Sequence, residues 1–93
     1  MSFIEKKLAN HPSCQCKVKI FDNGTIQFIS YSTLVIEANP VEGNEYELYC
    51  SGTYSQTTRK QIGYFLKEYF WNVDYYDMKK IAETGELIRA KRK

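Results

Sequence analysis

Several features that identify a class of protein are missing from this sequence. It has no run of about 18 apolar residues, so we expect no membrane-spanning helix. Its first residues lack the apolar core of a signal peptide, which predicts a cytoplasmic protein. No glycine-rich phosphate loop follows a strand, and the single histidine, His11, lies beside Pro12 in a loop. We therefore expect a protein that is not an enzyme and that needs no cofactor.

Cysteine is scarce, and the three residues of this type are Cys14, Cys16 and Cys50. An odd count without a secretion signal predicts free thiols in a reducing compartment. On a strand, Cys14 and Cys16 would point to the same face, where thiols are common core fillers. The alternative is a structural zinc module that adds His11 to the cysteines, but the second ligand pair of a zinc finger is missing. We predict no metal site.

Charge is small in sum but uneven along the chain. The net charge is +2, and the second half carries most of the Lys and Arg residues. Three of these cations, Lys91, Arg92 and Lys93, close the sequence. Residues 86–93 therefore read as a basic tail, an arrangement that permits an anionic partner without requiring one.

Alternation of apolar and polar residues predicts a sheet in residues 14–50. The turn at Asp22-Asn23-Gly24 and the turn residues from Asn39 to Asn44 separate its parts. We expect a four-stranded antiparallel meander, because short hairpins join consecutive strands. Its strands are expected at Cys14–Phe21, Thr25–Tyr31, Leu34–Ile36 and Glu45–Cys50. Residues 1–12 are expected to form a short N-terminal helix or an arm.

Helical periodicity begins after the sheet. Apolar residues from Ile62 to Val73 recur at helical spacing, which predicts a main helix over 55–71 that covers one face of the sheet. Ser55 is the expected N-cap, with Thr58 and Gln61 as an alternative capping box. Gly63 weakens this helix and could allow a strand or the Tyr31 ring to approach. A shorter helix over 74–84 ends at Thr84-Gly85. The fold class is a single α+β domain.

Two groups of residues on the main helix are candidate binding sites. Hydroxyls at the helix start and two adjacent cations predict an anion site, although both cations could simply face solvent. These residues are Ser55, Thr57, Thr58, Arg59 and Lys60. Further along, packing leaves surplus aromatic residues, which predicts a surface patch of Lys60, Tyr64, Lys67 and Trp71. The alternative for Trp71 is packing under the second helix.

Two stretches resemble a signature of small proteins of phages and plasmids that have no assigned function. They are Ser30–Ile36 and Tyr54–Gln61, continued by Phe65–Leu66. They are similar to the pattern Ser-Tyr-x-Thr…Tyr-Ser-x-Thr-Thr-x-x-His…Phe-Leu, with Gln61 at the position of the histidine. The resemblance implies a phage or mobile-element origin.

Small proteins of that origin resemble inhibitors of host defence, such as anti-CRISPR proteins. We therefore expect a non-catalytic protein that acts stoichiometrically on a protein or nucleoprotein target. The alternative is direct binding of nucleic acid through Arg59, Lys60, Lys67 and the basic tail. The uncovered face of the sheet could also pair with a second copy in a homodimer.

Overall fold

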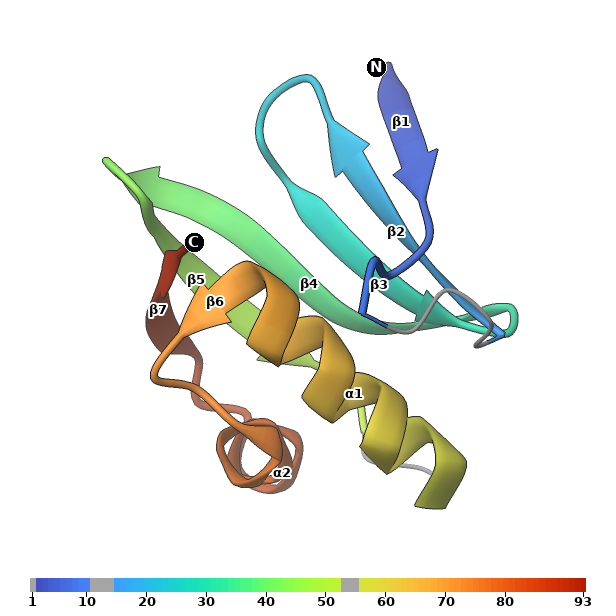
Figure 1. Ribbon diagram of the computed structural model, residues 1–93. Helices are drawn as coiled ribbons and strands as arrows, with labels where there is room; N and C mark the ends of the chain where they lie inside the picture. The colour runs from blue at the N-terminus through green and yellow to red at the C-terminus, as the bar shows by residue number, and fades with distance from the viewer. Residues whose placement is uncertain (1, 11–14, 53–55) are drawn as a thin grey trace.

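The computed structural model describes residues 2–10, 15–52 and 56–93. In these residues one antiparallel sheet of seven strands curves as a half-barrel around a long helix, with a second helix beside it (Figure 1). The strands are β1 (Phe3–Lys6), β2 (Cys16–Phe21), β3 (Ile26–Ser30), β4 (Thr33–Glu42), β5 (Glu45–Cys50), β6 (Phe70–Trp71) and β7 (Ile88–Arg92). The helices are α1 (Gln56–Tyr69) and α2 (Tyr75–Thr84).

The class α+β is correct, but the expected four-stranded sheet is wrong. The strand order is β1-β2-β3-β4-β5-β7-β6. Strands β2 to β5 are consecutive neighbours, because tight turns join them. Gly24 makes the first turn with a φ of 94°, and its amide donates to the carbonyl of Phe21 at 2.9 Å. The additional strands come from both ends of the chain and from the end of α1.

Strand β1 replaces the expected N-terminal helix or arm. It runs antiparallel to β2, with Ile4 opposite Ile20. The Phe3 ring lies 5.2 Å from that of Phe21, so the two strands also share an aromatic contact. A short helix here would have left β2 as the edge strand of the sheet, whereas β1 pairs with the outer backbone groups of β2.

Strand β7 replaces the expected basic tail and lies inside the sheet. It pairs with β5 on one side and with β6 on the other, with Ala90 opposite Tyr46. Ala90 is only 8% exposed, whereas its neighbours Arg89 and Lys91 are exposed. The period-2 alternation of a half-buried strand is therefore present in this charged segment.

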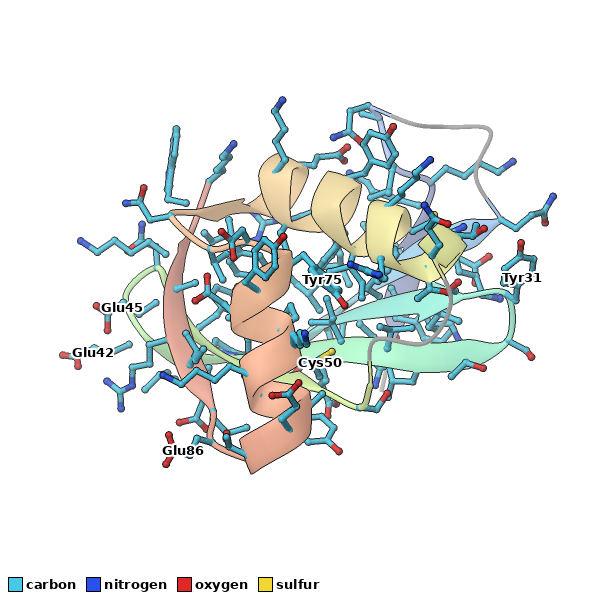
Figure 2. All side chains as sticks on the ribbon, turned by 90° about the horizontal axis from the view of Figure 1, so that it is seen from below. Tyr31, Glu42, Glu45, Cys50, Tyr75 and Glu86 are labelled. Carbon is cyan, nitrogen blue, oxygen red and sulfur yellow. The ribbon has the colours of Figure 1, made fainter. Side chains whose placement is uncertain are left out.

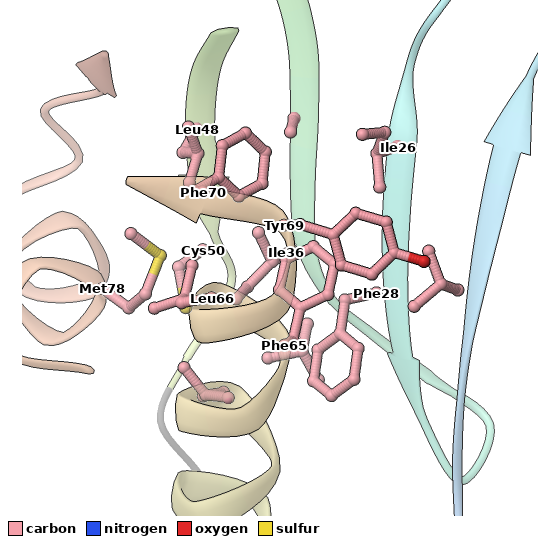
Figure 3. Packing of buried hydrophobic residues seen from close by; sticks show 14 of the residues in the cluster. Ile26, Phe28, Ile36, Leu48, Cys50, Phe65, Leu66, Tyr69, Phe70 and Met78 are labelled. Carbon is pink, nitrogen blue, oxygen red and sulfur yellow. The ribbon is translucent and has the colours of Figure 1, made fainter. Parts of the chain in front are cut away.

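Helix α1 fills the concave side of the half-barrel. Phe65 is fully buried and stacks on Phe28 of β3 with ring centroids 4.8 Å apart (Figure 3). Ile62 and Leu66 continue the same buried stripe. The helix ends at Tyr69 rather than at residue 71, because Phe70 and Trp71 pair with β7. The chain then turns at Asn72, which has a φ of 54°.

Helix α2 begins and ends at well-defined caps. The Asp74 carboxylate accepts a hydrogen bond from the Asp77 amide at 3.2 Å, and the Asp77 carboxylate accepts one from the Asp74 amide at 2.9 Å. Gly85 closes the helix in the left-handed region, at a φ of 77°. Met78 and Ile81 are buried, so α2 closes the core beside β5.

Candidate binding surface at Trp71

The pairing of β6 with β7 creates an aromatic and basic corner of the molecule. Trp71 lies opposite Lys91, and 54% of Trp71 is exposed. The Lys93 ammonium lies 4.6 Å from the centre of the Trp71 ring, within cation–π range. The same ammonium donates a hydrogen bond to the carbonyl of Lys67 at the end of α1. We call Lys67, Trp71, Lys91 and Lys93 the Trp71 corner.

Trp71 borders two surface depressions. The first, of about 570 Å³, lies between α1, β6 and the start of α2. Its lining includes Gly63, Lys67, Tyr75 and Lys93 as well as Trp71. The second has Lys91 of β7 on its wall and lies on the β5 side. Both edges of the indole are therefore open to a partner, and packing under α2, the alternative for Trp71, is not found.

The structure brings together only part of the predicted patch. Lys67 and Trp71 line the same depression. Tyr64 is 38% exposed but lies toward the N-terminal segment, where its carbonyl accepts a hydrogen bond from the Asn10 side chain at 3.1 Å. Lys60 is exposed two turns before Lys67 on the outer side of α1. The patch therefore divides along the helix. Lys91 of β7 and Lys93, which follows β7, supply cations that the predicted patch did not include.

The remaining predicted cations have partners within the fold. Arg59 lies over the Tyr75 ring, with the guanidinium carbon 4.9 Å from its centre, and so connects α1 to α2. Tyr75 lies between these helices (Figure 2). Arg92 lies 5.5 Å from the centre of the Tyr69 ring. Both contacts stabilise the domain. Because both arginines contact other rings, the cations of the Trp71 corner are all lysines.

The start of α1 differs from the predicted anion site. Thr57 is exposed, but Thr58 is buried, and its hydroxyl lies 3.5 Å from that of Ser30. Ser55, the expected N-cap, lies outside the described residues. Thr58 and Gln61 lie within the helix, which is already formed at Gln56, so they do not make a capping box.

A buried polar cluster connects the two stretches that resemble the signature of small phage and plasmid proteins. The Ser30 hydroxyl donates to the side-chain oxygen of Gln61 at 2.5 Å, and Gln61 is only 4% exposed. This contact joins the end of β3 to α1. Sequence reasoning missed it, although Gln61 lies next to Ile62 on the core-facing stripe of the helix. The side chain at the histidine position of the signature thus has an internal partner.

The cysteines do not assemble a metal site in the described part of the chain. Among residues 2–10, 15–52 and 56–93, no three His, Cys, Asp or Glu side chains lie together in a way that could hold a metal ion. His11 and Cys14 lie outside those ranges. Cys16 is disulfide-bonded, so the expectation of three free thiols is wrong. Cys50 is a buried free thiol in the core near Met78 (Figure 3).

Comparison with known proteins identifies a family. The sequence matches a family of unknown function, DUF8033, over residues 4–83. The chain belongs to DUF8033. The region shared with DUF8033 covers most of β1 and almost all of α2 and ends before β7, so Trp71 lies inside it and Lys91 outside. No curated protein and no solved structure matches the chain. Of the helices in the described ranges, none is long and apolar enough to cross a membrane.

Proposed function

We propose that this protein is a non-catalytic binding protein whose contact surface is the Trp71 corner. The observation that carries the proposal is the exposure of the single tryptophan, 54%, in a domain whose core is already filled by other aromatic residues. Phe65 and Phe70 are almost completely buried, and Tyr69 is 7% exposed. The fold therefore has no packing use for most of the Trp71 ring.

The surroundings of Trp71 support this proposal. Tryptophan and arginine dominate the energetics of interfaces, and an exposed aromatic ring flanked by cations is a typical binding anchor. Lys67, Lys91 and Lys93 flank the indole, and the depressions beside it allow a partner to enclose the ring. A partner that presents a negative or aromatic group would find both complementary charge and apolar area here.

We place this binding in the setting that the signature resemblance implies. The protein acts in the host cytoplasm, in stoichiometric amounts, on a protein or nucleoprotein target. A small domain that acts through a binding surface could inhibit a host defence nuclease in the manner of anti-CRISPR proteins. The resemblance of Ser30–Ile36 and Tyr54–Gln61 to small phage and plasmid proteins supports this setting.

Capture from a host lysate tests the proposal. Tagged wild-type protein is compared with Trp71→Ala and Lys67→Glu in nuclease-treated lysate, with bound proteins identified by mass spectrometry. Tyr49→Ala and Lys79→Glu are matched controls, because both residues are exposed and neither lines a depression at the corner. We expect a captured protein that both corner variants lose and both controls retain. If the corner variants retain every captured protein, the Trp71 corner is not a contact surface for proteins.

A further inference from the structure

We propose that the depression between α1 and α2 binds an unpaired base of a single-stranded nucleic acid. In this proposal the base stacks on Trp71, and the adjacent phosphates contact Lys67 and Lys93. The inference rests on the proposed function, because it assigns a ligand class to the same corner. Direct nucleic-acid binding is favoured over a protein partner by three features of the depression.

The first feature is Gly63, which lies in the middle of α1 and lines the depression. Glycine is the least favourable helix residue after proline. A Cβ added at Gly63 would meet nothing within 4 Å, so no packing constraint requires glycine. Its φ is also not in the left-handed region. The expectation that a strand or the Tyr31 ring approaches Gly63 is therefore wrong. A bare backbone at this point does allow a flat external group to approach closely.

The second feature is the pair of aromatic residues in the depression. Trp71 contributes an exposed ring, and Tyr75 contributes a half-buried one. Every base has a π-face, so stacking on such rings binds single strands with little dependence on sequence. The bases of a duplex are already stacked on one another and cannot offer a face to Trp71. The aromatic lining therefore favours single strands over duplexes.

The third feature is the charge on the rim. Lys67 and Lys93 line the depression, and Lys91 lies on the other side of the indole. The one acidic residue in the lining, Asp74, accepts the capping hydrogen bond of α2 and is held at the helix start. Lys60 continues the basic ridge along α1, about 10 Å from Lys67 at 1.5 Å per residue. A strand leaving the depression can follow this ridge.

Tryptophan fluorescence measures the proposed contact directly, because Trp71 is the only tryptophan. The probes are 12-nucleotide oligo-dT and oligo-U, a 12-base-pair duplex and heparin, each titrated at several salt concentrations. We expect both oligonucleotides to quench the fluorescence and to bind at least tenfold more tightly than the duplex. Two or three phosphate contacts predict a slope of log K against log salt of about −1.4 to −2.1.

Gly63→Gln is the decisive variant, because it fills the depression without changing charge and introduces a residue that favours helices. We expect it to lower oligonucleotide affinity at least tenfold while its melting temperature stays at or above that of the wild type. Lys67→Glu should have a similar effect on affinity, whereas Lys79→Glu, on the exposed side of α2, should change it less than twofold.

Two results would overturn the inference. One is binding of heparin and duplex as tight as that of the oligonucleotides and unaffected by Gly63→Gln, which would indicate a general cationic surface. The other is no oligonucleotide binding at low salt. If capture of a protein from nuclease-treated lysate still depends on Trp71, the proposed function stands and its partner is a protein. If oligonucleotides do not bind and protein capture does not depend on Trp71, both proposals fail.

Discussion

The buried hydrogen bond between Ser30 and Gln61 allows the clearest test of how the two signature stretches are coupled. The perturbation is a double-mutant cycle with Ser30→Ala, Gln61→Met and the double variant. Methionine is close to glutamine in shape but has no amide, so the double variant replaces the polar pair by apolar groups of similar size. The Ser30–Gln61 distance of 2.5 Å and the burial of both residues make the pair suitable for this cycle.

The expected magnitudes follow from the burial of these groups. Ser30→Ala leaves the Gln61 oxygen without its donor, and an unsatisfied buried polar group costs about 1–3 kcal/mol. Gln61→Met should cost less, because the Ser30 hydroxyl retains Thr58 as a partner at 3.5 Å. The double variant should cost less than the sum of the single variants by at least about 1 kcal/mol, since the Gln61 oxygen that Ser30→Ala leaves without its donor is then absent.

Urea denaturation followed by circular dichroism measures the three free energies of unfolding, provided that the m-value stays constant. For a domain of this size, 1 kcal/mol corresponds to about 4–8 °C in melting temperature, so thermal melts give an independent check. If the costs of the two single substitutions add to within about 0.5 kcal/mol, Ser30 and Gln61 are not coupled and the structural reasoning is refuted.

Three further perturbations have defined outcomes. Gly63→Ala should raise the free energy of unfolding by about 1 kcal/mol in urea titrations, because the added methyl meets no atom within 4 Å; a decrease would indicate a contact that the structure lacks. Removal of the residues from Ile88 onward should abolish cooperative unfolding and near-ultraviolet circular dichroism, because β7 is an internal strand; a folded truncated protein would return β7 to the role of a tail. Burial raises the pKa of the Cys50 thiol, so its protonated form is favoured in the folded state. The free energy of unfolding should therefore be highest below the ordinary thiol pKa of about 8.5 and fall as the pH rises above it. Cys50→Ala should show a shallower decrease, and an unchanged slope would contradict the assignment.

The central part of the fold was readable from the sequence because its patterns are local. The alternation in residues 16–21 and 45–50 fixes which side chains face the core, and the Asn23-Gly24 turn fixes the first hairpin. The stripe that contains Phe65 and Leu66 identified α1 as the cover of the sheet. Each of these features needs no information beyond a window of about a dozen residues.

The strands at the two ends of the sheet were missed because their partners are distant in sequence. Phe3, Ile4, Lys7 and Leu8 share a helical face, and only pairing with β2 makes Phe3–Lys6 a strand. Ile88 to Arg92 alternate as a strand does, but their charges favour a tail, and only their pairing with β5 and β6 identifies the strand. Phe70 and Trp71 continued the helical period and leave the helix only because β7 pairs with them.

The candidate site was predicted in part for the same reason. Lys67 and Trp71 lie four residues apart, so helical spacing alone predicts that their side chains are close together. The contribution of Lys91 and Lys93 depends on β7 and could not be read from local patterns. The expected capping role of Thr58 and Gln61 is wrong. Hydroxyl and amide groups at a helix start usually face solvent or cap the backbone, but here both side chains contact Ser30 in the core.

The position of β7 also has a consequence for synthesis on the ribosome. Among the strands of the described residues β6 pairs only with β7, and β7 follows all the other described elements in the sequence. At about 5–20 residues per second, the chain spends one to several seconds with α1 complete and Trp71 not yet in its final place. The indole is therefore positioned last, after the meander can already have formed. A nascent chain that does not yet contain β7 would lack the Trp71 corner, so any binding through it would begin only after β7 has joined the sheet.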